Sequence, residues 1–229
     1  MNATPVPHPR NDSSTKSTDQ SGRQREKQNA RKSVAVIMAA GTSSRFGTAD
    51  KRLASLPNGQ GLLAATLAST AAVFPVIRVV LREDDDPGAL GLAATTPILR
   101  APHASKGLGA SIGDAFAALE QDAELADVQA AAILLGDMPA LRLATLKALQ
   151  REARRELILR PVHAGSPGHP VLFGRAFWPE LANLMAGKNR HEGAKDVIRA
   201  HREHYVALEV DDPGIHLDID LIADLALFS

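Results

Sequence analysis

Two short, uninterrupted apolar runs, each leading into a glycine turn, constrain the fold of this chain most strongly. Residues 33–39 (SVAVIMA) are followed by Ala40 and Gly41, and residues 131–135 (AAILL) are followed by Gly136. A run that is apolar at every position, rather than at every second one, is typical of a parallel strand covered on both faces. The sequence therefore predicts two buried parallel strands whose carboxyl ends open into turns.

Helical and strand patterns alternate through the rest of the chain. We expect helices over 61–74, 107–119, 141–154, 175–185, 192–201 and 221–228, and further strands over 76–81, 98–99, 157–160, 170–173, 205–210 and 216–219. This alternation predicts an α/β fold, a three-layer, Rossmann-like, mostly parallel sheet with helices on both faces. Ligands of such sheets bind beyond the carboxyl ends of the strands, where the turns at Ala40 and Gly136 lie.

The composition divides the chain into residues 1–32 and a single domain over residues 33–229. The first segment is rich in Ser, Thr, Asn, Gln, Pro, Lys and Arg, and it cannot bury enough apolar area to offset its ordering entropy. We expect a disordered tail, with a basic docking arm as the alternative. The tail lacks the apolar core of a secretory signal, and no later apolar run suits a bilayer span, so we expect a cytoplasmic protein without a membrane partner.

Two features of the composition exclude whole classes of function. The formal net charge is zero, which argues against nucleic acid as a partner. The chain has no cysteine, so disulfides, thiolate metal sites and thiol catalysis are excluded. It also has neither a G-x-S-x-G elbow nor an HExxH pattern, which argues against a serine hydrolase and a zinc protease.

The turn after the first strand, Gly41 to Gly47, is a candidate anion site. Its glycines let backbone N–H groups approach a ligand closely, and Arg45 and Lys51 add the positive charge that a triphosphate needs. The turn is neither a Walker A loop nor a G-x-G-x-x-G fingerprint. A plain connection with two solvated cations is the alternative.

Carboxylates follow the second buried strand and precede the last expected helix. Asp137 is well placed to hold Mg²⁺, or else it caps the helix expected near residue 141. Asp218 and Asp220 would share one face of a strand end, so that one of them completes the metal site. Asp220 would otherwise cap the closing helix. The acidic run 84–86 is interpreted as a solvated loop.

Two other segments are candidates for ligand contact. Residues 107–112, which include Ser111, would present backbone N–H groups at the start of a helix. Residues 164–169 form a turn dense in glycine and proline, which can pack close to a ligand or serve only as a hairpin turn.

Taken together, these motifs resemble the MobA-like nucleotidyltransferases. Residues 39–51 are similar to the (L)AAGxSxRxG…K signature of that family, residues 136–139 (GDMP) to its GDMP motif, and residues 218–225 to its D-I-D/N-T-P-E-D-L ending. The resemblance implies a fold of the nucleotide-diphospho-sugar transferase type. It also implies Mg²⁺-dependent transfer of a nucleoside monophosphate to a phosphate-bearing acceptor.

Within that family, residues 161–173 are similar to the PxxxGxPGHPVLF stretch of molybdenum-cofactor cytidylyltransferases. The resemblance therefore favours CTP over GTP, with molybdopterin as acceptor and a molybdoenzyme as a further partner. Residues 187–195 depart from the family's Gly-Asp-x-Gly-Ala-Arg segment, and Leu221 and Ile222 replace its Thr-Pro. The alternatives are a guanylyltransferase, a sugar-1-phosphate nucleotidyltransferase, and a non-catalytic nucleotide-binding cofactor chaperone.

The resemblance also implies roles for single residues. Arg45 and Lys51 would act in catalysis by neutralising the triphosphate and the departing pyrophosphate. Mg²⁺ would be bound by Asp137, Asp220 and Asp218. The nucleotide would be bound by Ala40, Gly41, Thr42, Arg45, Lys51, Ser111 and Asp137.

Overall fold

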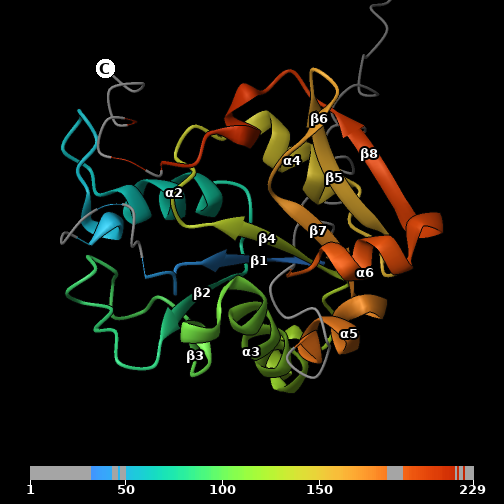
Figure 1. Ribbon diagram of the computed structural model, residues 1–229, viewed down its shortest axis with the longest axis horizontal. Coiled ribbons are helices and arrows are strands. Elements are labelled where there is room, and N and C mark those ends of the chain that lie inside the picture. The colour runs from blue at the N-terminus through green and yellow to red at the C-terminus, as the bar shows by residue number, and fades with distance from the viewer. Residues whose placement is uncertain are drawn as a thin grey trace, which may run out of the picture.

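The described part of the chain forms one eight-stranded mixed sheet (Figure 1). The computed structural model describes residues 32–42, 46, 50–184, 193–219, 221 and 224. The strands are β1 (Ser33–Met38), β2 (Ile77–Arg82), β3 (Ile98–Ala101), β4 (Ala130–Leu135), β5 (Ile158–His163), β6 (Ser166–Pro167), β7 (Val171–Gly174) and β8 (Tyr205–Glu209). Their order is β3-β2-β1-β4-β7-β5-β6, and β8 pairs with β5.

The sheet has a parallel half and a mixed half. Strands β3, β2, β1 and β4 are all parallel, whereas β7 runs antiparallel to both of its neighbours, β4 and β5. Strand β8 returns parallel to β5. The carboxyl ends of β1 and β4 therefore lie side by side in the middle of the sheet, where the sequence placed its two glycine turns.

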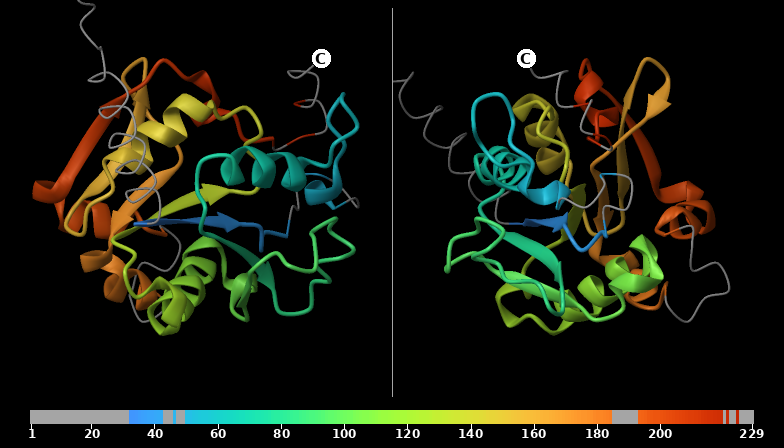
Figure 2. Two further views of the ribbon diagram at one scale, coloured as in Figure 1. Left: turned by 180° about the vertical axis from the view of Figure 1, so that it is seen from behind. Right: turned by 60° about the vertical axis from the view of Figure 1, so that its left-hand side comes forward.

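Helices cover both faces of this sheet. The α-helices are α2 (Leu62–Ala71), α3 (Leu108–Gln121), α4 (Leu143–Arg151), α5 (Trp178–Ala182) and α6 (Lys195–Ala200). The short 3₁₀ helices are η2 (Lys51–Leu53), η3 (Ala104–Lys106), η4 (Ala123–Leu125), η5 (Arg175–Phe177), η7 (Arg202–His204) and η8 (Pro213–His216). Helices α2 and α4 pack on one face, and α3, α5 and α6 on the other (Figure 2). The predicted three-layer architecture is confirmed.

Strand β1 shows why its sequence is apolar at every position after Ser33. Its side chains alternate between two hydrophobic cores, and each of its residues is buried. Val34, Val36 and Met38 contact the core beneath α3, while Ala35 and Ile37 contact the core beneath α2. A two-sided strand of this kind has no solvent face, and its one polar residue, Ser33, is buried as well.

The strand predicted over residues 216–219 is wrong. The chain forms η8 up to His216, because Asp212 is buried and its Oδ1 accepts a hydrogen bond from Gly214 N at 2.9 Å. Pro213 begins this turn, and a proline has no N–H to donate to a strand ladder. The residues that follow, Leu217 to Ile219, carry no strand assignment.

Several predicted boundaries shift, and some predictions lie outside the described residues. The helix predicted over 141–154 is shorter, and the one over 175–185 divides into η5 and α5. Most of the predicted tail (1–31) and most of the closing helix (221–228) fall outside the described part of the chain. In the part that is described, no helix has the length and apolarity needed to cross a membrane.

Candidate functional site

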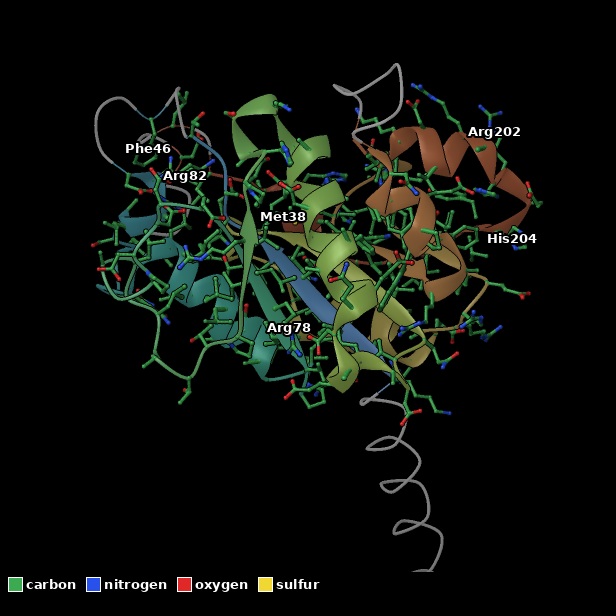
Figure 3. The ribbon with its side chains drawn as sticks, turned by 90° about the horizontal axis from the view of Figure 1, so that it is seen from below. Met38, Phe46, Arg78, Arg82, Arg202 and His204 are labelled. Atoms are coloured by element: carbon green, nitrogen blue, oxygen red, sulfur yellow. The ribbon has the colours of Figure 1, made fainter. Side chains whose placement is uncertain are left out.

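A cavity of about 330 Å³ opens beyond the carboxyl ends of β1 and β4. Its lining brings together five residues that the sequence analysis selected as nucleotide ligands: Ala40, Gly41, Thr42, Ser111 and Asp137. The first three follow β1, Asp137 follows β4, and Ser111 lies in the first turns of α3. Met38, which ends β1 and also lines the cavity, lies close to α3 in Figure 3.

Gly136 lets the chain turn close to β1 and delivers Asp137 to the cavity. Its N–H donates to the carbonyl of Met38 at 3.0 Å. A Cβ at this position would lie 3.2 Å from that carbonyl oxygen and 3.1 Å from the side chain of Leu63. A side chain on residue 136 would therefore push the turn away from the end of β1.

Only one of the two carboxylate oxygens of Asp137 has a partner among the described residues. Its Oδ2 lies 2.5 Å from Nζ of Lys51, a lysine that is only 7% exposed. Its Oδ1 is buried and has no hydrogen-bond partner among the described residues. Burial raises the pKa of Asp137 above its ordinary value, the ion pair with Lys51 opposes that rise, and the charge of Asp218 adds to it. The site thus holds a buried oxygen that one more cation would satisfy.

Asp137 does not cap the following helix, which was the alternative interpretation. Helix α4 begins after Arg142 without a side-chain cap. The carboxylate at that end is Asp212, whose Oδ2 accepts from Arg142 N at 3.0 Å and from Oγ1 of Thr145 at 2.6 Å. Asp137 therefore has no helix-capping role to explain its position.

The segment that contains Asp218 lies directly beside Asp137. The N–H of Ile219 donates to the main-chain carbonyl of Asp137 at 3.1 Å, and Asp218 is close enough for its charge to act on the Asp137 carboxyl. Asp220 and Arg45 lie outside the described residues. Within the described ranges, no group of three His, Asp or Glu side chains is arranged to hold a metal ion. Asp137 and Asp218 nevertheless offer the hard oxygen donors that Mg²⁺ prefers.

Sequence reasoning missed an arginine that anchors the turn carrying Lys51. Arg52 is 7% exposed, and one of its terminal nitrogens donates to the carbonyl of Ala39, next to the cavity, at 2.9 Å. Its other donors reach Asp50 at 2.6 Å and Asp85 at 2.8 Å. The guanidinium therefore ties η2 to the end of β1 and to the loop after β2.

The prediction that residues 84–86 form a solvated loop is wrong for Asp85. Its side chain is 6% exposed and accepts hydrogen bonds from both Arg52 and Arg82. Burial alone would raise the pKa of Asp85, but these hydrogen bonds hold it well below its usual range. Figure 3 shows Arg82 and Phe46 on the same side of the molecule, away from Arg202 and His204. No local sequence pattern marks the ion pair of Arg52 and Asp85, because the two residues are 33 positions apart in the chain.

The fold and the site together define a nucleotidyltransferase, in which strand-end turns and a carboxylate line one cavity, and a buried lysine, which does not itself line the cavity, is paired with that carboxylate. Residues 35–205 match the MobA-like NTP transferase domain, and the chain belongs to this family. No curated protein matches the chain.

Solved structures agree with this assignment. The chain is similar to the homologue of Mycobacterium tuberculosis Rv0371c from Mycobacterium sp. strain JC1, with a TM-score of 0.70 and 27% identity over 86% of this chain and 97% of that one. Rv0371c of M. tuberculosis H37Rv, solved in complex with manganese, gives 0.63 and 22% over 86% and 97%. Molybdopterin-guanine dinucleotide biosynthesis protein A of Archaeoglobus fulgidus gives 0.62 and 17% over 85% and 96%. The last two likenesses, at these identities, concern the fold alone.

Proposed function

We propose that the protein transfers CMP from CTP to the phosphate of molybdopterin, with Mg²⁺ as its cofactor and pyrophosphate as the second product. The observation that carries the proposal is the Asp137 carboxylate, which has one oxygen on Lys51 and one buried oxygen without a described partner. The choice of CTP and molybdopterin rests on the resemblance of residues 161–173 to the cytidylyltransferase stretch. The manganese complex of Rv0371c supports a divalent ion in this fold.

The residues fit a metal-bound triphosphate. Asp137 would hold Mg²⁺ together with Asp218 and Asp220, and the ion would supply charge neutralisation on the phosphate oxygens. The backbone of Gly41 and Thr42 would contact the nucleotide. Lys51 would exchange its contact with Asp137 for one with the triphosphate, because the incoming cation replaces its charge at the carboxylate.

The transfer needs no protein nucleophile. An anionic oxygen of the acceptor phosphate attacks the α-phosphorus of CTP and forms a new P–O bond. The bond from the α-phosphorus to the oxygen that bridges to the β-phosphate breaks, and pyrophosphate leaves with that electron pair. No proton has to be removed from the attacking oxygen, so the chain contributes positioning and electrostatic stabilisation.

A thermal-shift panel of CTP, GTP, ATP and UTP with Mg²⁺ or Mn²⁺ tests the nucleotide. At about one hundred times its dissociation constant, the correct ligand adds roughly 2.7 kcal/mol to the free energy of unfolding. We expect the largest shift with CTP, followed by pyrophosphate release when molybdopterin is added. A larger shift with GTP would instead favour a guanylyltransferase, the activity suggested by the name of the Archaeoglobus protein.

Two further outcomes would contradict the proposal in different ways. Pyrophosphate release with a sugar 1-phosphate, and not with molybdopterin, would identify a sugar-nucleotide enzyme. Saturable CTP binding without turnover on either acceptor would identify a non-catalytic nucleotide-binding chaperone.

A further inference from the structure

A second cavity, of about 170 Å³, shares a wall with the candidate nucleotide cavity. Leu108, at the start of α3, lines both cavities, and it is unusual in being a large apolar residue that is 47% exposed. The next turn of the helix contributes Ser111 to the first cavity and Ile112 to the second. Ligands in the two cavities would therefore be neighbours.

The second cavity has an apolar floor from β4 and β7, where the parallel half of the sheet meets the mixed half. Ile133 on β4 and Val171 and Phe173 on β7 supply it, and all three are buried in the core beneath α3. A floor of this kind suits a flat apolar group, because such a group loses water-exposed surface on binding.

Two cationic side chains line the second cavity and have no acidic partner among the described residues. Arg160 on β5 donates to the main-chain oxygens of Gly168 at 2.9 Å and of Pro167 at 3.4 Å, and Lys195 on α6 is exposed. Among the described residues neither forms an ion pair with a carboxylate. Positive charge that the fold leaves uncompensated beside an apolar floor favours an anionic ligand.

His169 adds a neutral hydrogen-bonding group to the same wall. Its Nδ1 is buried and has no described partner. Burial, reinforced by the charges of Arg160 and Lys195, lowers the pKa of His169 to about 4, so the ring is uncharged near neutral pH. The charge of Asp218 acts on both His169 and Asp137, so it reaches a residue of each cavity.

We propose that the second cavity is the acceptor subsite, which binds a phosphate monoester with a flat apolar body. Lys195 and Arg160 hold its anionic end, and the floor of β4 and β7 holds its body. Because Leu108 lines both cavities, the acceptor phosphate lies where the two cavities meet, so that one of its oxygens can approach the α-phosphorus. This inference rests on the proposed function. It adds where the acceptor binds and which residues of the protein select it.

The test is a calorimetric titration of the full chain with 1-naphthyl phosphate, a flat aromatic phosphate monoester. The titration is made with saturating α,β-methylene-CTP and Mg²⁺, so that no transfer takes place. We expect saturable binding, and a dissociation constant about tenfold higher in Lys195→Ala, which removes one charge-assisted contact. Lys147→Ala removes an exposed lysine from α4 on the opposite face and is expected to change nothing.

Two results would overturn the inference: no saturable binding of the probe to the wild type while the nucleotide analogue is bound, or an unchanged dissociation constant in Lys195→Ala. Because the probe needs no turnover, the two proposals fail separately. Lys195-dependent binding without any CMP transfer would leave the subsite standing and remove the proposed function. CMP transfer with an unchanged KM for molybdopterin in Lys195→Ala would do the reverse.

Discussion

The two neighbouring cavities differ in how the fold treats their charges. In the first, Lys51 is already paired with one oxygen of the Asp137 carboxylate, so Lys51 would have to exchange that partner when the proposed metal-bound triphosphate enters. In the second, Arg160 and Lys195 have no described carboxylate partner and are ready for an anion. The first cavity lies at the turns that follow β1 and β4, and the second lies over β4 and β7 beside α3 and α6. Under the two proposals above, the first cavity would carry out the chemistry and the second would select the acceptor.

Among the substitutions that test this comparison, Asp137→Asn is expected to have the largest effect. The substitution removes the carboxylate charge and keeps the shape, so turnover should fall about a hundredfold or more, on the order of 3 kcal/mol in barrier height. Steady-state rates of pyrophosphate release measure this loss, and far-UV circular dichroism should show an unchanged fold. Binding of 1-naphthyl phosphate should also be unchanged. Near-normal turnover would remove Asp137 from the metal site.

The stability of the protein is expected to depend on pH through His169, which lines the second cavity. Its folded-state pKa of about 4 lies below the usual 6.5, so the unfolded chain takes up a proton first as pH falls. The free energy of unfolding should therefore drop by up to about 3 kcal/mol as the pH falls from about 6.5 to 4. Above this pH window, the full contribution of neutral His169 to stability is present. Asp137 contributes with the opposite sign, since its folded pKa is raised.

Urea unfolding at pH 4.5 and pH 7, compared between the wild type and His169→Asn, isolates the histidine. The variant should lose less stability on acidification than the wild type. Equal pH dependence in both proteins would show that His169 is not held neutral by burial.

A third prediction concerns the anchor behind the first cavity. Arg52→Lys keeps the charge but cannot donate to Ala39, Asp50 and Asp85 together, so we expect a loss of about 2 kcal/mol in unfolding free energy. The turn carrying Lys51 should also loosen, which raises the KM for CTP more than it lowers kcat. Arg142→Lys, at a half-exposed arginine beside Asp211 and outside the cavity, is the control. An unchanged KM in Arg52→Lys would separate this network from nucleotide binding.

The smallest of these effects is expected from Lys51→Ala. Loss of one charge-assisted contact should weaken CTP binding roughly tenfold, about 1.4 kcal/mol. Calorimetry with α,β-methylene-CTP and Mg²⁺ gives the affinity directly, with Lys147→Ala as the matched lysine control. If the affinity for the nucleotide analogue stays the same, Lys51 serves only to balance Asp137.

The sequence predicted the architecture well because the relevant signals are local. The apolar run of β1 indicates burial on both faces of the strand, and the glycine at position 136 indicates a close approach of the backbone. The prediction failed at residues 216–219, which follow a 3₁₀ helix that Asp212 and Pro213 begin, and at Asp85, whose partner is remote in the chain.

The amino-acid sequence by itself determined the layers, the family and the residues that gather at the ends of β1 and β4. Only the tertiary structure decided that Lys51 rests on Asp137, that Arg52 reaches Ala39 and Asp85, and that Arg160, His169 and Lys195 share one wall. The physical reason lies in the range of the interactions. Side-chain periodicity records whether a residue is buried, whereas the partner of a charge depends on which distant strands the sheet order places next to each other.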